Sequence, residues 1–214
     1  MTKLIIFDFD GTLGDTCENI VKTMQETMSR KGYPVPGEEA ICATIGLPLA
    51  EGFKMLEPGM GEEEMAACAA LYREVFEEWR ERLVPQPFPG VRETLAQLHG
   101  RGLMLSVASS RKRPSLVGFI HDMGLEPYIS YVLGVDDAPK PKPDPAPVLK
   151  TLQELKTDAS EAIVVGDMPV DILMGSRAGA RTVGVTWGNG SREALGEAGA
   201  DHIIDSIGDL LNLI

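Results

Sequence analysis

The feature that most constrains the fold is an alternation of strand and helix patterns that runs from residue 91 to the end of the chain. Short runs rich in apolar and β-branched residues predict strands, at 103–108, 131–135, 162–166, 182–185 and 202–204. The segments between them have helical patterns, at 91–100, 116–123, 148–155, 172–178, 193–197 and 207–213. Such an alternation favours right-handed crossovers and a parallel sheet. With one more apolar run at residues 3–9, we expect an α/β fold with a Rossmann-like, doubly wound sheet.

One segment interrupts this alternation directly after the first strand. Residues 15–84 have helical patterns only, and the longest of these, at 62–82, carries a single apolar stripe. A run rich in proline and glycine at 85–90 is typical of a boundary. We therefore predict a core domain of residues 1–14 and 85–214, with a helical cap domain of residues 15–84 inserted into it.

Composition narrows the classes of partner. The 214 residues include 32 acidic and 20 basic side chains, which gives a net charge of −12. A chain this acidic repels nucleic acid and anionic lipid. The three cysteines are odd in number and widely spaced, which argues against a disulfide framework and a zinc site. Without a signal-peptide pattern or an apolar run of about 18 residues, we expect a cytoplasmic protein that acts on small molecules.

Polar residues follow each of the first four core strands. In an open parallel sheet, ligands bind beyond the carboxyl ends of the strands. The residues that stand there are Asp8, Asp10 and Thr12, then Ser109, Ser110 and Arg111, then Lys140 and Lys142, and finally Asp167 and Asp171. We expect carboxylates, a hydroxyl and a lysine to converge on one edge of the sheet.

The carboxylates in this group point to a divalent cation. Asp8 and Asp10 are two residues apart, so both face the same side of an extended chain. Like charges this close destabilise each other unless a cation or a proton intervenes. With Asp167 added, the oxygen ligands suit Mg²⁺. Taken alone, however, Asp8 and Asp10 also fit a turn before a helix, and Asp167 and Asp171 also fit a helix cap.

Four motifs, in order and each after a strand, resemble those of the haloacid dehalogenase superfamily of phosphohydrolases. The first is Phe-Asp-Phe-Asp-Gly-Thr-Leu at 7–13, the second is Ser109, the third is Lys-Pro-Asp-Pro at 142–145, and the fourth is Gly166-Asp167 with Asp171. The resemblance covers essentially the whole chain. Thr-Trp-Gly at 186–188 and Ala-Asp-His-Ile-Ile at 200–204 resemble the branch of phosphoglycolate phosphatases and related pyrophosphatases, and one branch of the superfamily inserts a helical cap at this point of the chain.

The resemblance implies a role for each residue. Asp8 would be the nucleophile, and Asp10 the general acid and then the base that activates water. Mg²⁺ would be held by Asp8, the Asp10 backbone carbonyl and Asp167, with Asp171 as a ligand or a neighbour of the ligands. Ser109 and the lysine would hold the phosphoryl oxygens. We further expect substrate contacts from Thr12, Ser110 and Arg111, and from Thr44 and Gly46 in the cap.

Two lysines compete for the third motif, since Lys140 and Lys142 each begin a Lys-Pro-x-Pro pattern. In the family, leucines that follow the motif open the core face of the next helix. Counting from Lys142 puts Leu149 and Leu152 at those positions, whereas counting from Lys140 puts a lysine there. We therefore expect Lys142 to lie beside Asp8.

The function that the resemblance implies is a Mg²⁺-dependent phosphatase of small phosphate esters, similar to phosphoglycolate phosphatase. An inorganic pyrophosphatase of the same branch is the nearest alternative. A phosphomutase and a non-catalytic binding protein are less favoured. A dehalogenase is disfavoured, because the family's dehalogenases lack the second aspartate that stands here as Asp10.

Overall fold

The computed structural model describes residues 2–80 and 82–214. These residues include a six-stranded parallel sheet in the order β5-β4-β1-β6-β7-β8. The strands are β1 (Leu4–Phe7), β4 (Met104–Ala108), β5 (Tyr131–Leu133), β6 (Ala162–Gly166), β7 (Arg181–Val185) and β8 (His202–Ile204). The expected α/β fold is confirmed. From β1 the chain adds β4 and β5 on one side, and then returns to add β6, β7 and β8 on the other side. The strand order therefore reverses between β1 and β6, and sheets of this kind bind ligands at such a position.

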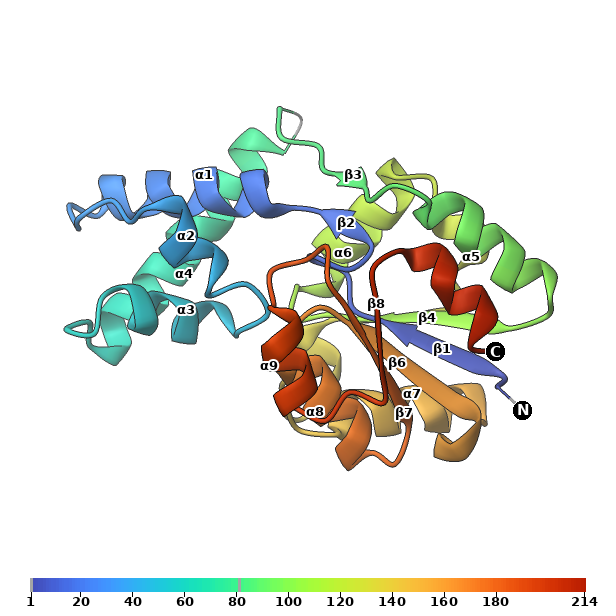
Figure 1. Ribbon diagram of the computed structural model, residues 1–214. Helices are drawn as coiled ribbons and strands as arrows, with labels where there is room; N and C mark the ends of the chain where they lie inside the picture. The colour runs from blue at the N-terminus through green and yellow to red at the C-terminus, as the bar shows by residue number, and fades with distance from the viewer. Residues whose placement is uncertain (1, 81) are drawn as a thin grey trace. The chain divides into compact units, whose positions relative to one another are not determined.

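Helices cover both faces of this sheet (Figure 1). Helix α5 (Val91–Gly100) lies on one face, and α7 (Ala146–Leu155) and α8 (Pro169–Arg177) lie on the other. Leu4 and Ile6 are two residues apart on β1, so both point to the same face of the sheet. On the side of α7 and α8 they form one buried cluster with Val148 and Met174. Around the sheet lie also α6 (Arg113–Asp122), α9 (Arg192–Glu197) and the 3₁₀ turns Glu126–Tyr128, Val135–Asp137, Ala159–Glu161 and Ile207–Asn212.

Three of the helices begin two or three residues before the predicted positions. Each has a proline in its first turn: Pro114 in α6, Pro147 in α7 and Pro169 in α8. Proline fits there because the first N–H groups of a helix have no partner within it. The predicted starts were late because they relied on the apolar pattern, and the first turn of each helix precedes that pattern. The last predicted helix, 207–213, is instead a 3₁₀ helix, Ile207–Asn212.

The chain divides into two compact units, one of Met1–Asp15 with Gln86–Ile214 and one of Thr16–Pro85. We call them the α/β unit and the helical unit. The helical unit holds α1 (Cys17–Arg30), α2 (Glu38–Cys42), α3 (Leu49–Leu56) and α4 (Glu62–Trp79), with α1 and α3 packed on α4. Its buried residues include Met24, Met28, Phe53, Tyr72 and Phe76. In the α/β unit, β2 (Gly14–Asp15) and β3 (Gln86–Pro87) pair antiparallel where the chain leaves and returns.

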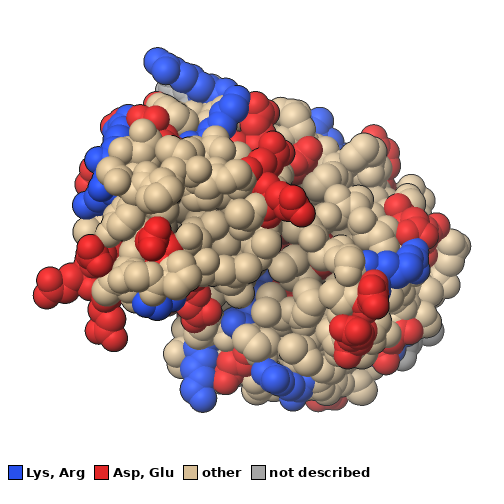
Figure 2. Space-filling view, turned by 60° about the vertical axis from the view of Figure 1, so that its left-hand side comes forward, with Lys and Arg blue, Asp and Glu red and all other residues tan. Residues whose placement is uncertain are grey.

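No helix in the described ranges has both the length and the apolar character needed to cross a membrane. Lysine and arginine lie among aspartate and glutamate on the face shown in Figure 2, without gathering into one basic patch there.

Candidate active site

The candidate site lies at the carboxyl ends of the neighbouring strands β1 and β6. Asp8 directly follows β1, and its backbone N–H donates to the carbonyl of Val165 at 2.8 Å, which continues the pairing of the two strands. Asp167 directly follows β6, and Asp171 lies in the first turn of α8. Gly166 lets these groups approach, because a Cβ there would come within 2.4 Å of the Asp171 carboxyl carbon. The strand reversal therefore brings together carboxylates that lie about 160 residues apart in the chain.

A buried lysine joins two of the carboxylates. The Nζ of Lys142 donates to Oδ1 of Asp8 at 2.6 Å and to Oδ1 of Asp171 at 2.7 Å. Their side chains are only 3%, 3% and 1% exposed, respectively. Lys140, by contrast, has a side chain that is 71% exposed and pairs with Asp144 at 3.5 Å. The structure thus places Lys142, and not Lys140, beside Asp8.

The helix register that led to Lys142 is only partly right. Leu152 is buried, but Leu149 is 49% exposed, so it does not open the core face as predicted. Helix α7 begins at Ala146 and turns Val148 and Leu152 toward the sheet, which fits the i, i+4 spacing of one helix face. Lys150 reaches back to donate to the carbonyl of Asp137.

Asp167 is held by donors on two loops. The hydroxyl of Thr12 donates to its Oδ1 at 3.0 Å, and the backbone N–H and side-chain amide of Asn189 donate to Oδ2 at 2.8 and 3.2 Å. The packing is so close that a Cβ on Gly11 or Gly188 would lie 2.3 or 2.4 Å from the same Oδ2. These contacts fix the orientation of a carboxylate that has no exposed surface.

Two features here were not foreseen from the sequence. Thr12 is fully buried and its hydroxyl is directed to Asp167, while its contact with substrate stays a prediction. Asn189 was missed altogether. The segment Trp187-Gly188-Asn189-Gly190 contained a signal, because glycines on both sides of a polar residue are typical of a backbone that approaches another group closely. The indole of Trp187 also donates to the carbonyl of Thr12 at 3.1 Å, which ties the two loops together.

Asp10 is buried and is paired with Arg111. The Nε of Arg111 lies 2.9 and 3.0 Å from the two carboxylate oxygens of Asp10, and its Nη2 lies 2.7 Å from Oδ1. The two side chains are 10% and 11% exposed. The guanidinium also lies over the ring of Phe119, 4.9 Å from its centroid.

The second predicted motif forms the turn that carries Arg111. Ser109 is buried, its backbone N–H donates to the carbonyl of Leu133, and its hydroxyl accepts from the N–H of Arg111 at 3.1 Å. Ser110 is half-buried beside it. The two residues predicted in the cap, Thr44 and Gly46, lie in the turn between α2 and α3 of the helical unit. Thr44 is buried and its hydroxyl donates to the carbonyl of Ile41, and the substrate contacts of Thr44 and Gly46 stay predictions.

Burial dominates the electrostatics. It raises the pKa of Asp8 well above its ordinary value; Lys142 opposes the shift, while Asp171 and Asp167 add to it. It also raises the pKa of Asp167 from 3.8 to about 6, again with a contribution from Asp171. Burial alone would lower the pKa of Lys142, but Asp171 and Asp8 raise it above its ordinary value. The lysine therefore stays charged, while the raised pKa values of Asp8 and Asp167 show that one lysine does not compensate the burial of these carboxylates in their ionised form.

The carboxylates fit a hard divalent cation. Asp8, Asp167 and Asp171 are all buried, and one carboxylate oxygen of each lies within 4.8 Å of the others. When ionised, the three carboxylates and Lys142 carry a net charge of about −2, which one divalent ion would neutralise. The donors are all oxygens, as Mg²⁺ prefers, and burial makes an uncompensated charge expensive.

Comparison with known proteins assigns the family. The sequence model of the haloacid dehalogenase-like hydrolase family matches residues 5–185. The chain is 38% identical to the probable phosphatase IndB of Dickeya dadantii, over 99% of this chain and 93% of that protein. It is 32% identical to the pyrophosphatase PpaX of Bacillus pumilus, over 98% and 95%, and 30% identical to a phosphoglycolate phosphatase of Yersinia pestis, over 98% and 92%.

A solved structure agrees with these relatives. It is a haloacid dehalogenase-like hydrolase from Bacteroides fragilis, with a TM-score of 0.93 and 26% identity over 98% of this chain and 100% of that one. The match spans both the sheet and the helical segment inserted after its first strand. The chain belongs to the haloacid dehalogenase-like hydrolase family.

Proposed function

We propose that this chain is a Mg²⁺-dependent phosphatase that hydrolyses a small phosphate monoester through an aspartyl-phosphate on Asp8. The observation that carries the proposal is the buried contact of Lys142 with both Asp8 and Asp171, beside Asp167. A solely structural role for this arrangement is disfavoured, because burying three carboxylates with one lysine costs several kcal/mol per unpaired ion.

The first step needs an ionised, oriented nucleophile. Lys142 holds Oδ1 of Asp8, which leaves Oδ2 as the oxygen that attacks phosphorus. Bound by Asp8, Asp167 and Asp171, Mg²⁺ would supply the positive charge that keeps these carboxylates ionised and draws in the phosphate. Thr12 and Asn189 keep Asp167 in one orientation, so little rearrangement is needed when the reaction begins.

Asp10 would transfer the protons in both steps. As a general acid it would give a proton to the leaving alcohol, and as a base it would then take one from the water that attacks the aspartyl-phosphate. Both oxygens of Asp10 are now within reach of the Arg111 guanidinium. We infer that the substrate phosphate draws Arg111 away from Asp10, and that the freed carboxylate then takes up the proton that it gives to the leaving group, so that phosphate binding and proton transfer are coupled.

Two substrates are favoured by the relatives' names. Phosphoglycolate leads, because a phosphoglycolate phosphatase is among the full-length relatives; pyrophosphate is the alternative, because pyrophosphatases are as well. We also propose that residues 15–84 act as the cap domain that chooses between them. Both reactions use the same chemistry at Asp8, so they differ only in the leaving group.

The test is hydrolysis of an aryl phosphate, with Mg²⁺ and with a chelator, followed by a panel that includes phosphoglycolate and pyrophosphate. We expect activity that requires Mg²⁺ and that Asp167→Ala shifts to higher Mg²⁺ concentration. A control is Asp205→Ala, since Asp205 has a side chain that is 71% exposed and pairs with Arg192 outside the carboxylate cluster. Activity that is unaffected by the chelator, or a Mg²⁺ titration that Asp167→Ala leaves unchanged, would contradict the proposal.

A further inference from the structure

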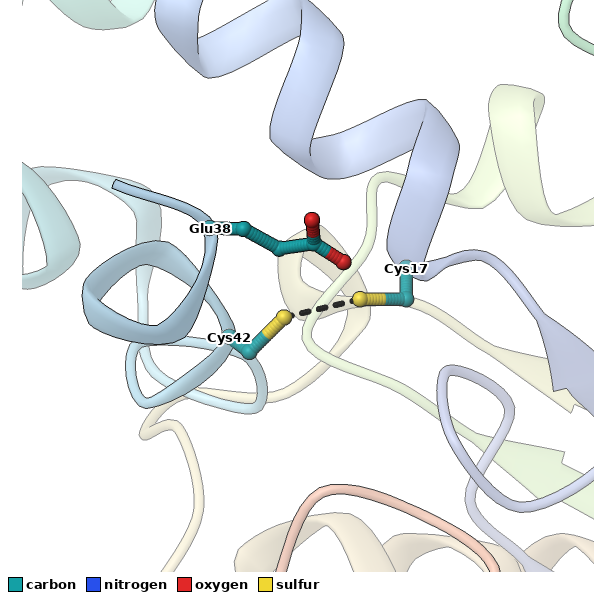
Figure 3. A group of neighbouring side chains, drawn as sticks. All are labelled: Cys17, Glu38 and Cys42. Atoms are coloured by element: carbon teal, nitrogen blue, oxygen red, sulfur yellow. Dashed lines mark hydrogen bonds between the residues drawn. The ribbon is translucent and has the colours of Figure 1, made fainter. Parts of the chain in front are cut away.

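Two of the three cysteines meet in the helical unit, although 25 positions separate them in the sequence. Cys17 is the first residue of α1, and Cys42 is the last residue of α2. Their Sγ atoms lie 2.8 Å apart, with one thiol as hydrogen-bond donor to the other (Figure 3). The carboxylate of Glu38, one turn before Cys42, points toward the same place. None of the groups proposed for phosphate hydrolysis belongs to this cluster.

We propose that Cys17 and Cys42 are a thiol-oxidation site, which closes to an intramolecular disulfide when it reacts with a low-molecular-weight disulfide. Closure needs the two sulfurs to approach by only about 0.8 Å, from their present separation to the length of an S–S bond. Both residues are half-buried, so a small oxidant can reach them. The third cysteine, Cys68, is buried and lies outside the pair.

The reaction consists of two thiol–disulfide exchanges. One cysteine, as its thiolate, attacks a sulfur of the small disulfide, which breaks that S–S bond and releases one small thiolate. The second cysteine then attacks the protein sulfur of the mixed disulfide and releases the other small thiolate. The two protons that the cysteines lose end on the two departing thiols. Overall, two protein thiols are oxidised to one disulfide, and one small disulfide is reduced to two thiols.

The geometry favours a disulfide over a metal site. Two thiolates on one tetrahedral zinc ion lie about 3.8 Å apart, given Zn–S bonds of about 2.3 Å. The sulfurs here are about 1 Å closer than that, at 2.8 Å, so zinc would have to push them apart. The third donor that a metal would need, Glu38, is on an exposed residue. Zinc binding is therefore the competing outcome of the test.

The link would tie the start of α1 to the end of α2. The turn that carries Thr44 and Gly46 begins directly after Cys42, so closing the disulfide would fix one end of that turn. Cross-linking two distant positions also restricts the unfolded chain, which stabilises the folded unit. This proposal does not depend on the proposed phosphatase activity, because its readouts are chemical.

The experiment treats the reduced full-length protein with oxidised glutathione, blocks the remaining thiols by alkylation and maps the peptides by mass spectrometry. We expect a peptide pair joined through Cys17 and Cys42, lighter by two hydrogen atoms, which a reducing agent separates. In the folded protein burial raises the pKa of the Cys68 thiol and shields it from the oxidant, so Cys68 should still be a thiol, and should be alkylated, when the protein is unfolded for alkylation. The oxidised protein should also melt at a higher temperature than the reduced one.

Variants make the test specific. In Cys17→Ser or Cys42→Ser, the remaining cysteine should retain glutathione as a stable mixed disulfide, and oxidation should no longer raise the melting temperature. Cys68→Ser is the matched control and should still form the link. If one serine variant does not fold, as judged by circular dichroism, the other and the unmodified protein still decide the question. Stable glutathione adducts on the unmodified protein, links between molecules, or stoichiometric zinc binding that blocks both thiols would each overturn the proposal.

Discussion

The two units of the protein bury different kinds of polar group. In the α/β unit the buried polar side chains include charged ones, namely Asp8, Asp10, Asp167, Asp171 and Lys142. Among the described residues of the helical unit, the buried polar side chains are neutral: Thr16, Asn19, Thr23, Thr27 and Thr44. The ion pairs of that unit, such as Arg30 with Glu78, lie on its surface.

This difference separates function from packing. A hydroxyl that donates to a backbone carbonyl of its own helix has its hydrogen-bond partner whatever the helix packs against. The hydroxyls of Thr23 and Thr27 donate in this way to carbonyls four residues before them. A buried charge needs a partner of opposite charge in an exact place, and removing that partner is strongly destabilising. We therefore attribute the buried charges to the chemistry of the site. In this protein they lie at one edge of the parallel sheet.

The largest effect should come from the nucleophile. Asp8→Asn keeps the shape of the side chain but replaces a carboxylate that can attack phosphorus with an amide that cannot. We expect turnover to fall to background in an aryl phosphate assay, while circular dichroism shows the fold intact. Retention of Mg²⁺-dependent turnover well above background would show that the buried charge of the α/β unit serves another purpose.

The two lysines of the third motif offer the next test. Lys142→Ala leaves Asp8 and Asp171 without their buried partner, so turnover should fall by orders of magnitude and stability by about 3–5 kcal/mol. Lys140→Ala removes an exposed side chain and should change little. Kinetics and urea unfolding of both variants check this. Similar defects in the two variants would refute the distinction between buried and exposed charge.

The effect at Asp10 should depend on the leaving group. General acid catalysis contributes about 10²–10⁴-fold, and it matters most when the leaving group is a poor one. Asp10→Asn should therefore slow hydrolysis of an alkyl phosphate far more than that of an activated aryl phosphate. The ratio of the two rates, measured for the variant and the unmodified protein, checks this. An equal slowing of both would argue against a proton transfer by Asp10.

The sequence predicted those features that depend on local pattern. Strand positions followed from short apolar runs, and the convergence of Asp8 and Asp167 followed from the rule that ligands bind at the carboxyl ends of parallel strands. Lys142 was placed beside Asp8, but on a register in which Leu149 should have been buried, and it is exposed. A family pattern thus identified the lysine better than it described the helix.

Other features depend on contacts between distant segments, and local pattern does not contain them. Thr12 and Asn189 meet at Asp167 only because two loops fold over it, and the pairing of Arg111 with Asp10 joins the ends of two strands. The cysteines show the same limit: their odd number and wide spacing argued against a disulfide framework and a zinc site, yet the packing of α1 and α2 brings two of them together. Spacing along the chain sets no limit on such contacts.

The buried carboxylates predict that stability of the metal-free protein depends on pH. The folded protein raises the pKa of Asp167 from 3.8 to about 6, so it binds this proton more tightly than the unfolded chain does. The resulting stabilisation is complete below about pH 4 and is lost as the pH rises through 6. At 1.36 kcal/mol per pKa unit, the loss is about 3 kcal/mol.

Urea unfolding at pH 4 and at pH 7.5, in a chelator, checks this dependence. Asp167→Asn removes one titrating group and should make the profile less steep, with Asp8 still contributing, while Mg²⁺ added to the unmodified protein should restore stability at the higher pH. Metal-free protein that becomes more stable between these pH values would reverse the expected sign and would mean that Asp167 is not the dominant group.

The smallest expected effect comes from making the same substitution, a buried threonine to valine, once in each unit. It tests the comparison of the two units most directly. Thr12 and Thr27 are both fully buried, and each donates its hydroxyl to one oxygen: Thr12 to the Asp167 carboxylate at 3.0 Å, Thr27 to the Thr23 carbonyl at 2.7 Å. Valine has nearly the same shape but no hydroxyl. In Thr27→Val, the carbonyl keeps its helical N–H partner, so the free energy of unfolding should change by less than about 1 kcal/mol.

In Thr12→Val the acceptor that loses its donor is charged. A hydrogen bond to a charged group contributes about 1.5–3 kcal/mol, so this variant should be the less stable of the two by urea unfolding at pH 7.5. It should also need more Mg²⁺ for half-maximal activity, because Asp167 would no longer be held on its Oδ1 side. Thr27→Val should leave that concentration unchanged. The substitution and the burial are the same in the two variants, and only the charge of the acceptor differs. Equal effects would therefore mean that the negative charge of Asp167 does not strengthen the hydrogen bond that it accepts.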